Sequence, residues 1–95
     1  MKTYVMGLCA KRHPYPVEDC IFPQWIDHDL TMDQLERMAD KKIPEDCSRL
    51  AVYVSGIMVG ILAVVAACSK RNISVTAYVY DPRKKKYNRQ EVLSY

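Results

Sequence analysis

The chain has 95 residues, 49% of them apolar and 26% charged, which fits one globular domain and is too short for two. It holds no low-complexity tract, fixed-period repeat or Gly/Ser linker, so fibrous, solenoid and disordered classes are excluded. The net charge of +3 is uneven, because residues 55–95 carry seven Lys and Arg against two Asp and Glu, whereas residues 1–54 carry seven against nine. A basic half attracts anions such as nucleotides or nucleic acid, although it also occurs as an ordinary solvated surface.

The amino-terminal residues predict no secretory signal, because their apolar part is short and Lys11, Arg12 and His13 follow at once. We therefore expect a cytoplasmic protein whose cysteines are free thiols.

Residues 2–8, KTYVMGL, predict a first strand, and residues 9–19 a loop that contains two prolines. Residues 20–26 are apolar, but Pro23 excludes a central strand, so we expect an edge strand or an extended covering segment there. Thr31 and Gln34 form a capping box, which predicts a helix from about Met32 to Ala39 or Asp40.

Residues 50–69 carry no charge and allow two interpretations. Twenty uncharged residues can cross a bilayer as one helix, and Gly56 and Gly60 form the G-x-x-x-G motif of helices that pack in lipid. In the other interpretation, β-branched and aromatic residues 51–54 form a buried strand, Ser55-Gly56 breaks it, and residues 57–68 form a helix. The second interpretation is favoured because residues 73–80 have the composition of another strand.

This order of elements predicts a small Rossmann-like α/β domain over residues 1–95. We expect a mostly parallel sheet of four or five strands, with a βαβ unit at 51–80 and a tendency to three layers. Asp81-Pro82 begins a basic turn, after which residues 87–93 return as an antiparallel edge strand.

The helix predicted at 57–68 is apolar on all sides, whereas a helix outside a small sheet normally shows water a polar face. A second copy of the chain is one cover for it, so we expect a homodimer through or near residues 57–71 and no membrane. The alternative is that the amino-terminal segment folds over this helix.

In an open α/β sheet, ligands bind where the parallel strands end, and here that is the turn at Ser55 and Gly56. The next helix points its free N–H groups there, so the turn is a candidate anion site, although Ser55 also serves as a simple helix cap. The turn matches neither a dinucleotide-binding motif nor a P-loop.

If the first strand and strand 51–54 are adjacent and parallel, Lys11, Arg12 and His13 follow at the same edge. Lys11 or Arg12 is then placed to hold phosphate and His13 to act as an acid or base, although a plain surface histidine is the alternative. His28, between two aspartates, is a further candidate. Cys9, His13, Cys20 and His28 follow no metal-site spacing, so we expect no metal and no cofactor.

The segment VYVSGIMVGILAVVAACSKRNISVTAYVYD, followed by a basic turn and RQEVLSY, resembles the carboxyl-terminal half of small CRISPR-associated accessory proteins with a reduced Rossmann-like fold. Several such families are similar to domains that sense cyclic oligoadenylates, and some act as ring nucleases. The resemblance covers residues 50–95 and rests on βαβ texture, the Ser-Gly at the strand end and a terminal Glu-Val strand.

The resemblance implies a symmetric dimer that holds a cyclic oligonucleotide across its two-fold axis. A ring nuclease of this kind is a metal-independent phosphodiesterase, which positions a ribose 2′-hydroxyl for in-line attack on the adjacent phosphate. His13 and Ser55 are then the candidate catalytic residues, and the candidate ligand-binding residues are Lys11, Arg12, Ser55 and Gly56.

Two alternatives remain open. One is a non-catalytic interaction protein of a phage or mobile element, whose basic turn at 83–86 contacts an acidic partner or nucleic acid. The other is a single-span membrane protein.

Overall fold

The computed structural model describes residues 2–9, 17, 19–23, 26, 29–54 and 58–95. In these residues it contains the strands and helices β1 (Lys2–Cys9), β2 (Cys20–Phe22), α1 (Met32–Lys42), β3 (Cys47–Val54), α2 (Met58–Lys70), β4 (Ser74–Asp81) and β5 (Lys86–Leu93). The uncharged run is therefore divided between a strand and a helix, as the strand–helix interpretation predicts. No helix in the described ranges is long and apolar enough to cross a membrane.

The strands form one mixed sheet in the order β2-β1-β3-β4-β5. The first four strands are parallel, and β5 runs antiparallel to β4. A small α/β domain with a mostly parallel sheet and an antiparallel carboxyl-terminal edge strand is thus confirmed. In particular, β1 and β3 are adjacent and parallel, so the chain leaves both strands at the same edge of the sheet.

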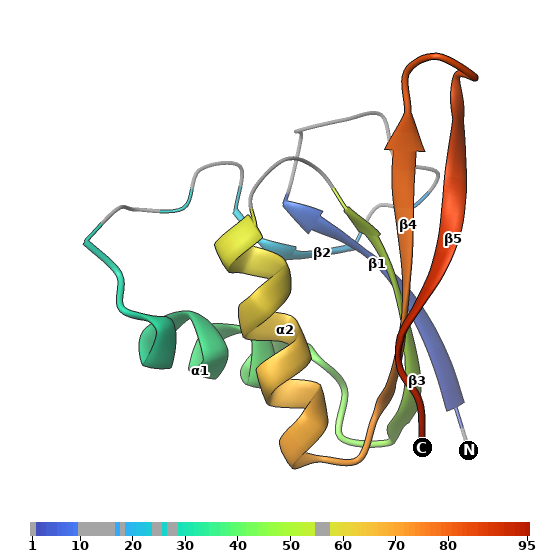
Figure 1. Cartoon of the computed structure of the whole chain (residues 1–95). Coiled ribbons are helices and arrows are strands. Elements are labelled where there is room, and N and C mark those ends of the chain that lie inside the picture. Colours follow the sequence, from blue (N-terminus) through green and yellow to red (C-terminus); the bar gives the residue numbers. More distant parts are fainter. Residues whose placement is uncertain (1, 10–16, 18, 24–25, 27–28, 55–57) are drawn as a thin grey trace.

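Both helices cover the same face of the sheet (Figure 1), so the described elements make two layers and not the three expected. The strand order explains this result. The crossover from β2 through α1 to β3 and the crossover from β3 through α2 to β4 move along the sheet in the same direction. Two right-handed crossovers in one direction place their helices on one face.

The core lies between the helices and this face. Its fully buried side chains come from the alternating positions of the central strands and from one side of α2, and they include Leu8, Leu50, Val52, Val64 and Val75. Gly60 lets Ile26 pack tightly against α2 where α2 lies on the sheet, because a Cβ there would lie 3.3 Å from Ile26 Cδ1 and 3.5 Å from Leu8 Cδ2. Gly60 therefore serves helix-on-sheet packing.

The predicted start of the first helix is confirmed, and the second helix ends at a residue suited to that position. The Gln34 backbone N–H donates to Thr31 Oγ1 (3.2 Å), and the Thr31 N–H donates to Gln34 Oε1 (2.8 Å), which makes the predicted capping box. After α2, Asn72 adopts a left-handed backbone with φ of 55°, as expected for an asparagine that ends a helix.

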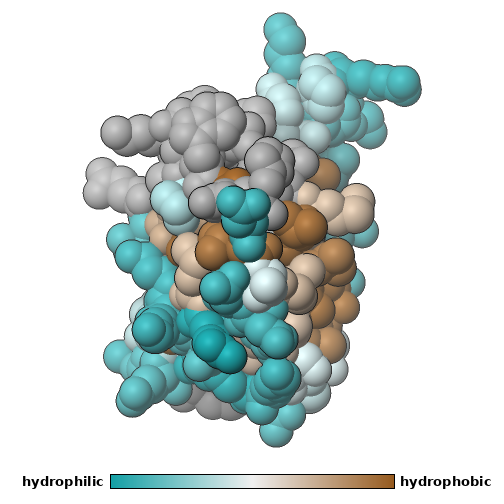
Figure 2. All heavy atoms as spheres, turned by 90° about the vertical axis from the view of Figure 1, so that its left-hand side faces the viewer, coloured by the Kyte–Doolittle hydropathy of each residue, from teal (hydrophilic) through white to brown (hydrophobic). Residues whose placement is uncertain are grey.

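The outer side of α2 leaves apolar side chains in water. Met58, Val59 and Leu62 are 74%, 44% and 51% exposed. Figure 2 faces the helix side of the molecule and shows apolar surface bordered by polar surface. Ile26 contacts α2 at Gly60, but this contact leaves the three side chains exposed, so the described part of the amino-terminal half does not cover them.

Candidate functional site

The residues that the sequence predicts for the site fall outside the described ranges. Lys11, Arg12 and His13 follow β1, Ser55 and Gly56 follow β3, and none of the five is described. The same holds for His28. What the fold does establish is that the two segments leave the sheet at one edge, since β1 and β3 are parallel neighbours.

A hairpin with basic residues lies beside the carboxyl ends of the parallel strands, and this side of the sheet is called the carboxyl edge. β4 also ends there, at Asp81, and the chain turns back into β5 at Lys86. Asp81 Oδ1 accepts hydrogen bonds from the backbone N–H groups of Arg83 (2.9 Å) and Lys84 (3.4 Å), and Lys85 has a φ of 52°. These features set the turn, as asparagine and aspartate side chains commonly do. Figure 1 shows the hairpin projecting beyond the other strands.

The hairpin carries four consecutive cations, Arg83, Lys84, Lys85 and Lys86, all exposed. Four ion pairs are found among the described residues, and none of them includes a hairpin cation. The charge is therefore not neutralised by a described carboxylate within 4.0 Å. This segment, residues 83–86, is called the basic hairpin below.

Four tyrosines gather on the sheet face opposite the helices. Tyr53 of β3 pairs in register with Tyr78 of β4, and Tyr80 pairs with Tyr87 of β5. Their rings are in contact: Tyr53 stacks on Tyr78 with centroids 4.8 Å apart, and Tyr87 packs edge-on against Tyr53 (4.8 Å) and Tyr80 (5.3 Å). These four residues are called the tyrosine face below.

The tyrosine face follows from strand alternation. Leu50, Val52 and Val75 point to the helices and are buried, so the intervening residues of β3 and β4 point to the opposite face. On that face Arg49, Arg89 and Glu91 are exposed, and Arg89 Nη2 lies 2.8 Å from Glu91 Oε1. Sequence reasoning missed this cluster, although the spacing of Tyr78 and Tyr80 already places both on one side of a strand.

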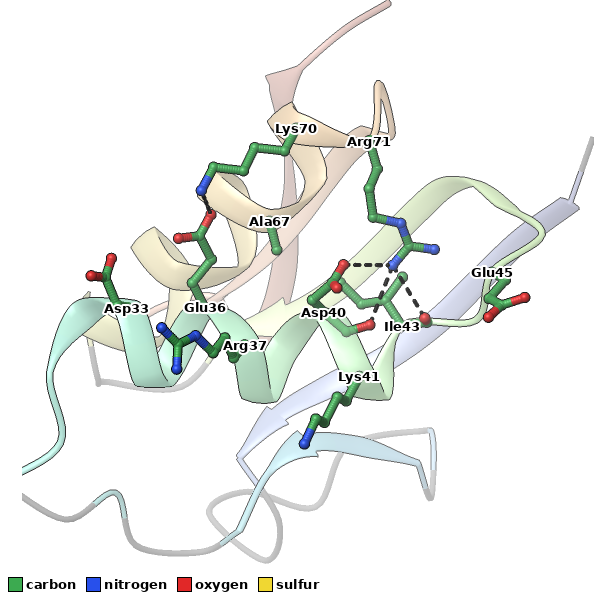
Figure 3. Close-up of a pocket in the computed structure, with 10 residues that line it drawn as sticks. All are labelled: Asp33, Glu36, Arg37, Asp40, Lys41, Ile43, Glu45, Ala67, Lys70 and Arg71. Atoms are coloured by element: carbon green, nitrogen blue, oxygen red, sulfur yellow. Dashed lines mark hydrogen bonds and ion pairs between the residues drawn. The ribbon is translucent and has the colours of Figure 1, made fainter.

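A groove between α1 and the end of α2 is a less suitable anion site (Figure 3). It has a volume of about 940 Å³ and is lined by Asp33, Glu36, Asp40 and Glu45 as well as Arg37, Lys41, Lys70 and Arg71. The four acidic and four basic side chains balance, so the groove has little net attraction for an anion. Lys70 and Arg71 are moreover engaged, with Glu36 at 2.8 Å and Asp40 at 3.1 Å.

Three of the four cysteines are poor candidates for a nucleophile. None of the four forms a disulfide, and burial raises the pKa of the Cys20, Cys47 and Cys68 thiols, that of Cys68 from 9.0 to about 12. These three thiols are thus neutral near pH 7, whereas a reactive cysteine is a thiolate. Among the described side chains, no group of three or more His, Cys, Asp and Glu is placed to hold a metal ion.

Comparison with known proteins found no match for this chain. No family model matches the chain, and no curated protein or solved structure matches it significantly. The candidate functional features of the chain are therefore the basic hairpin, the tyrosine face and the edge where the parallel strands end.

Proposed function

We propose that this chain is a cytoplasmic, homodimeric, Rossmann-like nucleotide-binding protein of prokaryotic antiviral defence, and that it binds a cyclic oligoadenylate at the carboxyl edge of its parallel strands. One observation carries the proposal: the basic hairpin stands at the edge where β1 and β3 also end. That edge is where open α/β sheets bind ligands. The resemblance of residues 50–95 to CRISPR-associated accessory proteins supplies the class of ligand.

The charge of the hairpin suits a ligand that carries one phosphate per nucleotide. Its four cations are exposed and lie within a few residues of one another, so their fields add at the edge of the sheet. Exposed charges are screened beyond about 8 Å at physiological ionic strength. Attraction by this hairpin therefore requires phosphates close to the edge, and affinity should fall as salt is added.

The proposed dimer forms through the exposed apolar side of α2. Met58, Val59 and Leu62 lie in the first half of this helix, which begins just after β3 reaches the carboxyl edge. A second copy packed on these residues would remove them from water and bring two carboxyl edges near each other. A ring-shaped ligand on the two-fold axis could then contact both subunits.

If the bound ring is cleaved, the step proceeds within the ligand. The ribose 2′-oxygen attacks the adjacent phosphorus, a 2′,3′-cyclic phosphate forms, and the bond to the 5′-oxygen breaks. His13 is the group that would accept the 2′-hydroxyl proton or protonate the leaving oxygen. Lys11, Arg12 and Ser55 would stabilise the charge on the phosphate, with Gly56 allowing close approach.

Labelled cyclic tetra- and hexa-adenylate provide the test. We expect the purified chain to bind one of these rings and any cleavage to persist in chelator. The triple variant R83Q/K84Q/K85Q should weaken binding and reduce the salt slope by roughly 0.7 per cation removed. The matched variant R37Q/K41Q/K42Q, which removes the same charge from α1, should bind like the natural chain. Absence of binding to both rings would remove the proposal.

The non-catalytic interaction protein remains the second candidate, since the same exposed hairpin favours an acidic partner. Binding of a cyclic oligoadenylate without its cleavage would support the non-catalytic protein over a nuclease.

A further inference from the structure

We propose that the tyrosine face is a second binding site, which takes single-stranded nucleic acid by stacking unpaired bases on its rings. This site lies on the flat face of the sheet and has a different ligand, so it goes beyond the proposed binding of a cyclic oligoadenylate at the carboxyl edge. Three observations carry it: the position of the rings, the charge around them and the kind of side chain.

The first observation is that neither described helix packs on this face (Figure 1) and that its four rings are partly accessible to solvent. Both helices pack on the opposite face (Figure 1), and Tyr80 is 38% exposed while Tyr53, Tyr78 and Tyr87 are half-buried. The mutual contacts of the rings hold them in place, with Tyr53 at the centre between Tyr78 and Tyr87. Rings that are already ordered lose little conformational freedom when a base stacks on them.

The second observation is charge, which selects the occupant. Arg89 is paired with Glu91 on this face, whereas Arg49 is in none of the ion pairs found among the described residues. The basic hairpin continues directly from the strands that carry Tyr80 and Tyr87. A second copy of the chain on this face would bring like charges together, and that arrangement costs affinity. A polyanion is attracted to the same surface.

The third observation is that the clustered side chains are aromatic, which favours nucleic acid over other polyanions. An acidic peptide requires cations but no row of aromatic rings, whereas bases stack on aromatic side chains regardless of their identity. Bases in a duplex stack on one another and do not present their faces. A sheet surface with tyrosines therefore favours an unpaired strand, with its phosphates toward Arg49 and the basic hairpin.

Fluorescence anisotropy with labelled oligo-uridine and oligo-thymidine of about twelve nucleotides tests this site, with a duplex of the same length as a comparison. The natural chain should bind the single strands more tightly than the duplex. Y78L/Y80L should weaken binding about tenfold or more, since loss of one stacked base costs roughly that factor, and it should leave the salt slope unchanged. Y78F, which keeps the ring, should bind like the natural chain.

Tyr95 supplies a matched control, because it is exposed and bonds to Ser69 at the end of α2, away from the tyrosine face. Y95L should therefore leave affinity unchanged. Shifts of the Tyr78 and Tyr80 backbone amides on titration of the natural chain locate the contact without any variant. Equal loss in Y78L/Y80L and Y95L, equal affinity for the duplex, or no amide shift would overturn the proposal.

Two further outcomes separate this proposal from the other functions. If R83Q/K84Q/K85Q loses cyclic oligoadenylate binding and Y78L/Y80L keeps it, the chain has two sites. If both variants lose it, the cyclic oligoadenylate binds on the tyrosines, which overturns the second site. A natural chain that self-associates until Tyr78 is replaced would show that a second copy occupies the face, which also overturns it. Single-strand binding without binding of either ring refutes only the proposed function.

Discussion

Arg71 joins the end of α2 to the end of α1, and its replacement by alanine is the sharpest test of the packing described above. Its Nη2 donates to the Pro44 carbonyl at 2.7 Å. Its Nη1 lies 3.3 Å from the Ile43 and Asp40 carbonyls and 3.1 Å from Asp40 Oδ1. These carbonyls belong to the last turn of α1 and the residues just after it, where the helix itself leaves acceptors without partners.

The expected loss can be estimated from the environment of each contact. The ion pair with Asp40 contributes little, about 0–1 kcal/mol, because the Asp40 side chain is 54% exposed. The bonds to the Ile43 and Pro44 carbonyls are part-buried, and hydrogen bonds that involve a charged group contribute roughly 1.5–3 kcal/mol. Since Nη1 shares three acceptors, we expect Arg71→Ala to lower the free energy of unfolding by about 2–3 kcal/mol. In a domain of this size that lowers the melting temperature by about 10–20 °C.

Urea and thermal unfolding followed by circular dichroism measure this loss, and two variants divide it into parts. Asp40→Asn removes the ion pair alone and should cost less than about 1 kcal/mol. Lys41→Ala removes a charge from the same helix end, where Lys41 is exposed, and should change stability by less than about 0.5 kcal/mol. If Arg71→Ala costs no more than Lys41→Ala, or if Asp40→Asn accounts for the whole loss, the carbonyl contacts do not hold the helices together.

Three other changes test separate features. Leu62→Glu places a charge on the exposed apolar side of α2, so sedimentation should show dissociation of the proposed dimer. The melting temperature should fall as well, because the second subunit no longer stabilises the folded chain. An unchanged oligomer would contradict this interface. Gly60→Ala should leave the free energy of unfolding nearly unchanged, because a helix-propensity gain of about 1 kcal/mol offsets the tight 3.3 Å approach to Ile26. Gly60→Leu should lower the free energy of unfolding, measured with denaturant, by about 1–3 kcal/mol. Burial raises the pKa of Cys68 to about 12, so the thiol of the unfolded chain loses its proton at a lower pH and stability should fall as pH rises from about 9 to about 12. In Cys68→Ala the melting temperature should fall less steeply over this range. If it falls equally steeply in both proteins, Cys68 is not the cause of the decline.

The local elements could be predicted from the sequence because their signals are short-range. Thr31 and Gln34 define a helix start by their spacing alone, and the structure contains both hydrogen bonds. The expected break at Ser55-Gly56 agrees with β3 ending at Val54 and α2 beginning at Met58. Asn72 ends the second helix in the backbone conformation that this residue tolerates.

Features that depend on strand pairing could not be predicted in this way. β3 begins at Cys47, four residues before the predicted start, because Arg49 and Cys47 also pair with β1, with a register shift at Ser48 between them. The layer count was wrong because it depends on strand order, which local composition does not encode. The tyrosine face depends on the register of three strands, since Tyr53 and Tyr87 join Tyr78 and Tyr80 only when β3, β4 and β5 are aligned.

The proposed second site depends on the position of the tyrosines, which lie on the sheet face that the described helices do not use (Figure 1). A chain of 95 residues buries a limited part of its surface, and both of its described helices are used on one face. Exposed charged side chains such as Arg49 would suffice to keep the other face in water. Four tyrosines in ring contact leave part of their ring surface exposed, and the proposed second site uses this surface. Because the residues around them are basic, the partner that gains most from this surface is one that joins flat apolar rings to negative charge, as an unpaired nucleic acid strand does.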